Sequence, residues 1–476
     1  MPNITIKRLD ARLLWTLFGL AALSFAFTLT LPYVGEEGVY TITALEMKLR
    51  GNLLLNTLYG GNYGRPPLLN WLIIGLSDVL GWQHVLQASR LVAALSTVAT
   101  GLVLAWLAHA LTRDARFAAF TALVYLTSDA LFYRGWLAYS DPLFALLVFS
   151  AIACLWVAAE RRDARLLWLA ALALVCASLA KAPTAYIFYA GAGCVLLCRR
   201  DTRAFLLRPA ALLPHLLAIG AFFVWHDLLT AGTQKATEAS VVLEKLSKFE
   251  LGPYLYQLWW FPLESLLRFL PASALAIYFW WRKSATAPAP APKLSIATCA
   301  WILGLNYLPY WLGPNTGIRY VLPLYPLAAL VIAYLLWPQS EARKRTVLCW
   351  LIAAIAFKYL LALWAFPAYQ QKFRGDYAGV AAQIEALTKG SPLYTTDVSA
   401  TGLSVTANID TMRFPAQPLQ WPPPEWSSGF VLSYTENPEL GRLWRKFQLG
   451  GNEIFLLCRG AACAAESRDA QPAPTR

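Results

Sequence analysis

Eleven long apolar stretches restrict this 476-residue chain to a membrane fold. A helix needs about 20 predominantly apolar residues to cross the hydrocarbon core of a bilayer. We therefore expect a mainly α-helical polytopic membrane protein with about 11 transmembrane helices. The predicted spans cover 13–31, 88–111, 117–133, 142–159, 165–182, 184–198, 207–228, 263–281, 295–313, 320–337 and 346–366.

The composition excludes the other broad classes of protein. Hydrophobic residues make up 58% of the chain and charged residues only 14%, whereas a typical soluble domain is about 25% charged. An ordinary soluble enzyme does not fit these values. A disordered chain does not fit either, because disorder requires low hydrophobicity.

The basic residues orient the predicted spans, because cytosolic turns are rich in Lys and Arg. With a cytosolic N-terminus, the inside segments hold 18 basic and 6 acidic residues, and so carry 12 of the 13 net positive charges. The positive charge is thus expected on the cytosolic side of the membrane, where it faces anionic lipid. A nucleic-acid-binding protein would instead gather it on one folded surface. The first span is expected to be an uncleaved signal anchor.

Residues 367–476 form the least membrane-like segment and lie outside if eleven spans precede them. Their patterns predict a small α/β domain. The expected elements are helices over Asp376–Thr388 and Pro438–Phe447 and strands over Pro392–Thr396, Gly429–Tyr434 and Glu453–Cys458. We therefore expect a transmembrane domain over 1–366 and an outer domain over 367–476.

Cysteines and prolines add two local expectations. An oxidising outer compartment would allow a disulfide between Cys458 and Cys463, the alternative being two free thiols. The Ala/Pro stretch Ala285–Pro292 is typical of a linker, here on the cytosolic side.

Charged side chains gather at the predicted outer ends of several spans. The first outer loop, 32–87, is long for a connection and contains Glu36, Glu37 and Arg65, followed by a short apolar helix at the interface over Leu68–Leu80. Later outer ends carry Asp141, Lys181 and Arg319. Ionisable groups at the ends of membrane spans are costly to place there, so we treat these residues as candidates for a functional site.

A transporter would place such charges near the midplane, whereas these lie at the rim and suit a lipid-linked substrate. Arg65, Lys181 and Arg319 could hold a phosphate in the headgroup layer. A carboxylate of the first loop could be a general base for a hydroxyl acceptor.

At these positions the chain resembles the lipid-dependent membrane glycosyltransferases with the C-type fold. The nearest group comprises the bacterial relatives of protein mannosyltransferases and of the lipid A aminoarabinose and galacturonic acid transferases. Five motifs occur in the family's order, all on the predicted outer side. They are Glu36-Glu37 with Tyr40, Glu46 and Gly51; Gly64-Arg65-Pro66-Pro67-Leu68; Ser140-Asp141-Pro142; Leu179-Ala180-Lys181-Ala182-Pro183; and Arg319-Tyr320-Val321-Leu322-Pro323.

The resemblance implies transfer of a sugar from a polyprenyl-phosphate donor to a lipid, polysaccharide or protein acceptor. It places the reaction on the periplasmic side of a bacterial inner membrane. The family's catalytic carboxylate falls on Glu36, with Glu37 as the alternative, and Asp141 would orient the acceptor or support the base. The family pattern also assigns Tyr40 and Tyr320 to substrate binding.

Two departures from the family pattern affect the expected chemistry. Glu36 replaces the usual Asp and extends the carboxylate by one methylene group. Gly64 replaces an acidic residue, which removes a possible metal ligand. We therefore expect no cofactor, and a divalent metal has no support in the sequence.

Two other functions remain open at this point. A transporter or flippase of a lipid-linked sugar would need no catalytic base. A non-catalytic membrane scaffold would bind a partner through its outer domain. The order of the five motifs favours the transferase.

Overall fold

The computed structural model describes residues 10–128, 134–230, 250–282, 295–314 and 316–467. The chain divides into two compact units, one comprising 1–28 and 91–362 and the other 29–90 and 363–476. The first outer loop, 32–87, falls outside the unit that contains most of the apolar helices. It belongs to the same unit as the C-terminal region.

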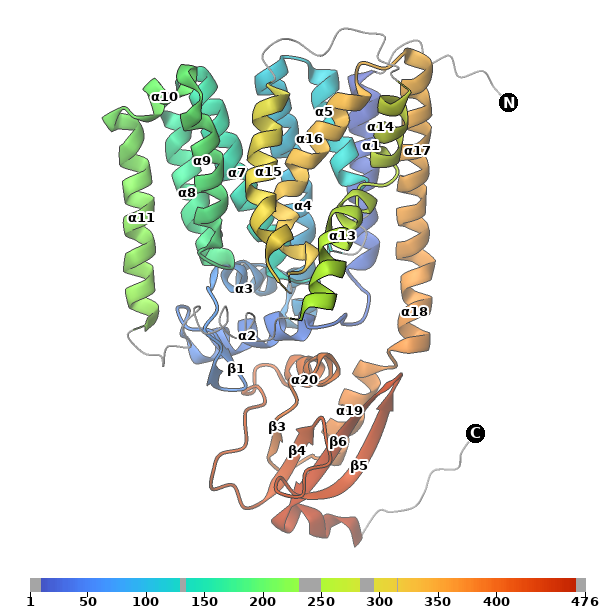
Figure 1. Ribbon diagram of the computed structural model, residues 1–476. Coiled ribbons are helices and arrows are strands. Elements are labelled where there is room, and N and C mark those ends of the chain that lie inside the picture. Colours follow the sequence, from blue (N-terminus) through green and yellow to red (C-terminus); the bar gives the residue numbers. More distant parts are fainter. Residues whose placement is uncertain (1–9, 129–133, 231–249, 283–294, 315, 468–476) are drawn as a thin grey trace. The chain divides into compact units, whose positions relative to one another are not determined.

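The first unit is a bundle of apolar helices (Figure 1). Helix α4 begins in the second unit and continues into the first. The helices and helical turns are α1 (Ala11–Leu23), η1 (Ser24–Thr28), α4 (Val85–Thr112), α5 (Ala115–Leu126), α7 (Ser140–Arg161), α8 (Arg165–Ala180), α9 (Thr184–Cys198), α10 (Arg200–Leu206), α11 (Pro209–Thr230), α13 (Leu251–Leu267), α14 (Ala272–Trp281), α15 (Ile296–Leu312), η3 (Ile318–Leu324), α16 (Tyr325–Leu336) and α17 (Glu341–Leu360).

The bundle is that of a multi-pass membrane protein. Among the described residues, five helical runs are long and apolar enough to cross a membrane, or six with the bent pair formed by α10 and α11. The five runs cover Ala11–Thr28, Trp82–Thr112, Ser140–Arg161, Ile318–Leu336 and Glu341–Phe373. Each predicted stretch contains a helix, but several, such as α8 and α9, have 16 and 15 residues. Helix length alone therefore supports fewer spans than the sequence predicts.

One predicted span, 263–281, is not a single helix. The chain forms α13, turns at 268–271, and begins α14 after Pro271. Proline cannot donate the backbone hydrogen bond that a helix interior requires, so the break falls where the ring stands.

The second unit combines helices with a four-stranded sheet. The sheet order is β3-β4-β6-β5, with β3 parallel to β4 and the other neighbours antiparallel. Its elements are α2 (Glu37–Arg50), β1 (Thr57–Leu58), β2 (Gly61–Asn62), α3 (Leu68–Leu80), η2 (Trp82–His84), η4 (Leu361–Ala365, which begins in the first unit), α18 (Phe366–Phe373), α19 (Tyr377–Leu387), β3 (Leu393–Thr395), α20 (Ala400–Arg413), β4 (Gly429–Ser433), β5 (Arg442–Leu449), β6 (Asn452–Arg459) and η5 (Gly460–Ser467).

A shared hydrophobic core explains why the first loop belongs to this unit. Tyr33, Val39, Ile42 and Tyr59 are buried in one cluster with side chains of α19, α20 and the sheet. Helices α2 and α20 approach so closely that a Cβ added to Gly38 would lie 2.4 Å from the carbonyl oxygen of Leu403. Burial of apolar surface is the main favourable term in folding, so the loop and the C-terminal region stabilise each other.

Several predicted elements of the second unit are confirmed. Helix α3 has the predicted bounds, and α19 begins where Asp376 accepts a hydrogen bond from the Gly379 N–H at 2.8 Å. Strands β3, β4 and β6 occupy the predicted segments.

The predicted helix over Pro438–Phe447 is wrong, because most of that segment is strand β5. A Gly450-Gly451 turn joins β5 to β6, and Gly450 has φ +59°. Two-residue Gly-Gly turns are a strong hairpin signal, and here the hairpin outweighs the helix start suggested by Pro438. Helix α20 was not predicted. Its Thr, Val and Gly residues are poor helix formers, and tertiary burial overrides that propensity.

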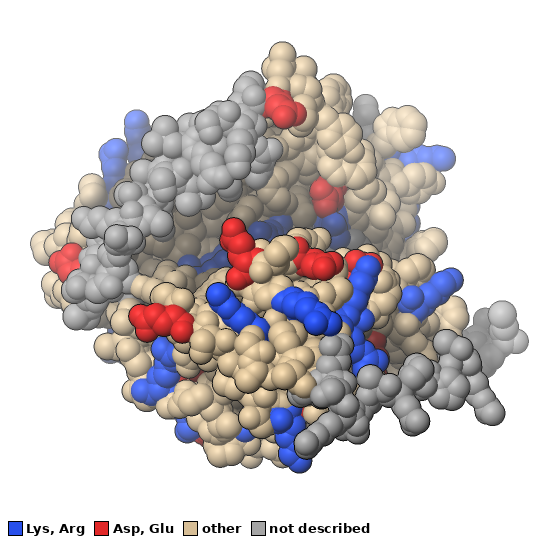
Figure 2. All heavy atoms as spheres, turned by 90° about the horizontal axis from the view of Figure 1, so that it is seen from below, with Lys and Arg blue, Asp and Glu red and all other residues tan. Residues whose placement is uncertain are grey.

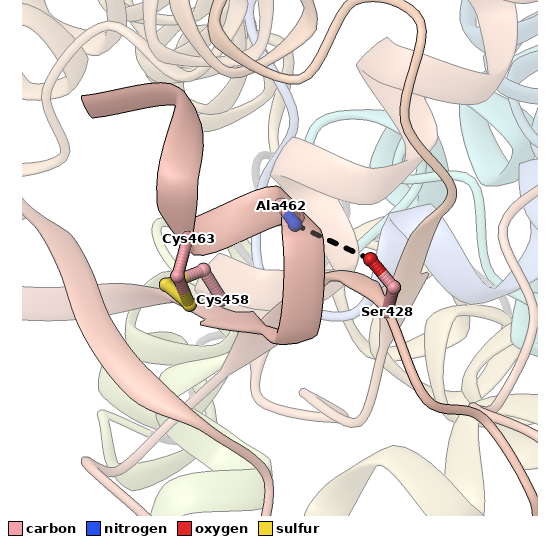
Figure 3. Close-up of a disulfide and its surroundings, with 4 residues drawn as sticks. All are labelled: Ser428, Cys458, Ala462 and Cys463. Atoms are coloured by element: carbon pink, nitrogen blue, oxygen red, sulfur yellow. Dashed lines mark hydrogen bonds between the residues drawn. A yellow bond between two sulfur atoms is a disulfide. The ribbon is translucent and has the colours of Figure 1, made fainter. Parts of the chain in front are cut away.

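The structure pairs Cys458 with Cys463, as the sequence predicts (Figure 3). The bridge links the end of β6 to η5, where the Ala462 N–H also donates to the Ser428 hydroxyl at 3.2 Å. The predicted linker at Ala285–Pro292 lies outside the described residues.

Candidate active site

The exposed carboxylate of the first loop is Glu36, at the N-terminus of α2. Its charge acts on Tyr63, as do Tyr40 and Arg65, and we call these four residues the loop cluster. An Arg65 Nη1–H donates to the Tyr40 hydroxyl at 3.4 Å, and the guanidinium carbon lies 5.0 Å from the centre of the Tyr63 ring. Burial raises the pKa of Tyr63, Arg65 lowers it, and the charge of Glu36 raises it. A carboxylate, a cation and a second phenol of the loop cluster therefore lie within electrostatic range of Tyr63.

Glu37, the alternative base, has a different environment. Its carboxylate and the Arg90 guanidinium are both fully buried and form a two-pronged ion pair, with Nε to Oε1 at 2.9 Å and Nη2 to Oε2 at 2.6 Å. The Val34 N–H also donates to Oε2, at 2.8 Å. Both carboxylate oxygens of Glu37 thus accept hydrogen bonds from inside the protein, whereas the side chain of Glu36 is exposed.

A second group of predicted residues meets in the first unit. We call Asp141, Lys181, Arg319 and Tyr320 the helix-end cluster. Lys181 follows the last residue of α8 and forms an ion pair with Asp141 in the first turn of α7. Its Nζ also lies 5.6 Å from the ring centre of Phe144 and 5.2 Å from that of Tyr320. The ammonium group is thus held by one carboxylate and two aromatic faces.

Arg319 and Tyr320 enter this cluster from η3. The Arg319 guanidinium carbon lies 5.2 Å from the centre of the Tyr320 ring, and Nη2–H donates to the Tyr320 hydroxyl at 3.4 Å. Tyr320 also stacks on Tyr310 of α15, with ring centres 6.5 Å apart. Two cations therefore flank one tyrosine ring, and fixed cations are suited to bind an anionic group such as phosphate.

Glu46, which the family pattern also includes, makes contacts that hold the local structure together. It is fully buried on α2, where the Thr57 hydroxyl and the Gly60 N–H donate to its carboxylate. Burial raises the pKa of Glu46. The contacts tie the β1–β2 hairpin, and hence the segment leading to Arg65, to α2.

Asp410 of α20 lies within electrostatic range of Glu46 and is also buried. Its Oδ1 accepts the Leu419 N–H at 2.8 Å, and Oδ2 has no hydrogen-bond partner among the described residues. Burial raises the pKa of Asp410 well above its ordinary value of 3.8; the Leu419 N–H and Arg413 lower it, and Glu46 raises it.

We expect the second unit to lose stability as the pH rises through the raised pKa of Asp410. A carboxyl whose pKa is higher in the folded than in the unfolded state contributes fully below the ordinary Asp pKa of 3.8. That contribution is lost as the pH passes the folded pKa. An Asp410→Asn variant cannot ionise, so its unfolding temperature should fall less as the pH rises above 3.8. Thermal unfolding of the purified protein over a pH series measures this.

Asp78→Asn is the control for this experiment. A hydrogen bond from Lys48 lowers the pKa of Asp78, so that carboxylate contributes stability in the opposite direction, at higher pH. If the unfolding temperatures of the wild type and Asp410→Asn changed in parallel as the pH rises above 3.8, the prediction would be contradicted.

Sequence reasoning missed Tyr63, Arg90 and Asp410. Arg90 had a usable signal, since it is a lone arginine near the start of the apolar stretch 88–111. Tyr63 and Asp410 had none, because their roles depend on contacts between segments distant in the sequence. The described residues hold no group of three or more His, Cys, Asp or Glu placed to bind a metal ion.

The face drawn in Figure 2 mixes acidic and basic side chains. Residues 367–476 carry 10 residues of each sign. No single-sign surface of the kind that binds nucleic acid is visible on this face.

Comparison with known proteins identifies related sequences. A family model described as dolichyl-phosphate-mannose-protein mannosyltransferase matches residues 45–231. Two proteins named undecaprenyl phosphate-alpha-4-amino-4-deoxy-L-arabinose arabinosyl transferase are similar over part of the chain. The one from Enterobacter sp. (strain 638) is 28% identical over 125 residues, 26% of this chain and 22% of its own length. The one from Edwardsiella ictaluri (strain 93-146) is 29% identical over 130 residues, 27% of this chain and 23% of its own length.

The structural comparison covers nearly the whole molecule. The crystal structure of ArnT from Cupriavidus metallidurans bound to undecaprenyl phosphate matches with a TM-score of 0.67 and 12% identity, over 95% of this chain and 99% of that chain. The chain has the fold of this transferase. The resemblance inferred from the sequence is therefore confirmed. The segment matched by the family model contains Arg65, Asp141 and Lys181, whereas Glu36 and Arg319 lie outside it.

Proposed function

We propose that the chain transfers a sugar from a polyprenyl-phosphate-linked donor to an acceptor at the outer face of the bacterial cytoplasmic membrane. The helix-end cluster carries this proposal, because it holds Lys181 and Arg319 on aromatic rings in a chain with the ArnT fold. The acceptor is a hydroxyl-bearing lipid, polysaccharide or protein. The membrane arrangement we propose has eleven spans, a cytosolic N-terminus and a periplasmic C-terminal region.

The chemistry is a single displacement with one base. Glu36 accepts the proton of the acceptor hydroxyl, whose oxygen attacks the anomeric carbon of the sugar. The bond from that carbon to the phosphate oxygen breaks, and polyprenyl phosphate leaves with the electron pair. Arg65, Lys181 and Arg319 are assigned to phosphate binding, where fixed cations stabilise the charge of the leaving group. Tyr40 and Tyr320 are assigned to substrate binding. Asp141, which pairs with Lys181, is assigned to orienting the acceptor or supporting the base.

A transfer assay tests this function. The purified chain receives a labelled pool of polyprenyl-phosphate sugars, with membrane extract as the acceptor. We expect release of polyprenyl phosphate coupled to label in a new product, with an inverted anomeric configuration. Label that crosses a vesicle membrane without transfer would support a transporter instead. A product that retains the configuration would contradict the single displacement.

A further inference from the structure

The buried guanidinium of Arg90 donates several hydrogen bonds near the first loop. Besides Glu37, it donates to three backbone carbonyls of the segment that enters the loop. Nη1 donates to Leu29 at 3.3 Å and to Leu31, and Nη2 donates to Pro32 at 2.8 Å. One side chain at the start of α4 thus fixes the backbone over 29–32.

Glu37 extends this network to the other side of the turn. The turn contains Gly35, which has φ +60°. The carboxylate of Glu37 binds the Arg90 fork and also accepts the Val34 N–H. Residues before and after the turn are therefore tied to one rigid planar group. Glu36 lies between these anchored points, and its side chain is exposed.

A role in stability alone does not account for this arrangement. An isolated buried ion pair is weak support for stability, because desolvation offsets most of the attraction. The guanidinium instead supplies donors in several fixed directions, which an ammonium group cannot reproduce. That property matters where a backbone segment must hold one geometry.

We infer that Arg90 is a positioning residue, which presents the carboxylate of Glu36 by fixing the turn before α2. This inference rests on the proposed function. Arg90→Lys keeps the positive charge opposite Glu37 but loses the spread of donors. Displacing a reacting group by about 1 Å can cost about 100-fold in rate. We therefore expect kcat to fall between about 10-fold and 100-fold, with an unchanged KM for the donor.

The matched control is Arg199→Lys. Arg199 also pairs with two carboxylates, Glu160 and Asp201, at 2.5 Å each, but it belongs to the first unit and has no assigned role. We expect this control to keep the wild-type kcat. Glu36→Gln is assayed in parallel. If Glu36→Gln transfers sugar normally, the proposed base is wrong, whatever the Arg90 variants do.

A second variant covers the case in which Arg90→Lys does not fold. The double change Glu37→Gln with Arg90→Met removes both buried charges, so neither is left unpaired, and it also removes the bonds to the carbonyls. At a wild-type unfolding temperature, a kcat reduced at least about 10-fold supports the inference. A wild-type kcat in any folded Arg90 variant overturns it. Failure of both variants to fold would assign the pair to folding alone and would also overturn it.

Discussion

Replacing Glu36 by Gln is expected to lower kcat by at least about 100-fold, the smaller end of what a general base contributes. The amide has nearly the same shape but cannot accept the hydroxyl proton. Because Glu36 is exposed and its side chain does not cap α2, the unfolding temperature should stay close to that of the wild type. The transfer assay gives kcat, and thermal unfolding of the same preparation gives the stability.

Glu37→Gln is the matched control, because the same chemical change at the next residue meets a different environment. It leaves the Arg90 charge buried without its partner, and breaking a buried pair in this way costs about 3–5 kcal/mol. We expect a lower unfolding temperature for Glu37→Gln, in contrast to Glu36→Gln. If Glu37→Gln were stable but inactive and Glu36→Gln fully active, the two roles would have to be exchanged.

Replacing Lys181 by Met is expected to reduce kcat/KM for the donor about 100-fold to 1,000-fold, the effect of removing one fixed group that stabilises developing charge. The substitution keeps most of the side-chain length but removes the cation that lies over Phe144 and Tyr320. Donor titrations at saturating acceptor measure the change.

Asp141 offers a way to separate phosphate binding from local charge balance. Lys181→Met alone leaves the mostly buried Asp141 carboxylate without its cation. The double variant Lys181→Met with Asp141→Asn removes both charges. If Lys181 binds phosphate, the double variant should stay as inactive as Lys181→Met. Recovery of donor turnover would show that Lys181 serves only to neutralise Asp141.

Much of the fold could be predicted from local patterns. Apolar length indicated where the membrane helices lie, and alternation with turn residues indicated β3, β4 and β6. Two errors arose where local and tertiary signals conflict. Pro438 favoured a helix where a Gly-Gly hairpin places β5, and α20 has a sequence with low helix propensity that burial nevertheless holds as a helix.

The residues of the candidate site could be predicted more readily than their environments. Charged residues at the predicted outer ends of spans pointed to Glu36, Asp141, Lys181 and Arg319. Glu36 and Glu37 are adjacent and chemically identical, so sequence could not tell which one is buried. The contact that distinguishes them comes from Arg90, more than 50 residues away. Sequence alone cannot predict such a contact without knowing how α2 and α4 meet.

The close approach of Gly38 to the backbone of Leu403 has a consequence for exchanging parts between related proteins. A chimera that replaces only residues 363–476 would pack a foreign helix against α2. The two helices meet so closely that position 38 of α2 has no room for a side chain. A chimera that transfers 29–90 together with 363–476 keeps both surfaces from one parent. The part of this protein that can be exchanged as one module is therefore discontinuous in the sequence, because the first loop and the C-terminal region belong to the same compact unit.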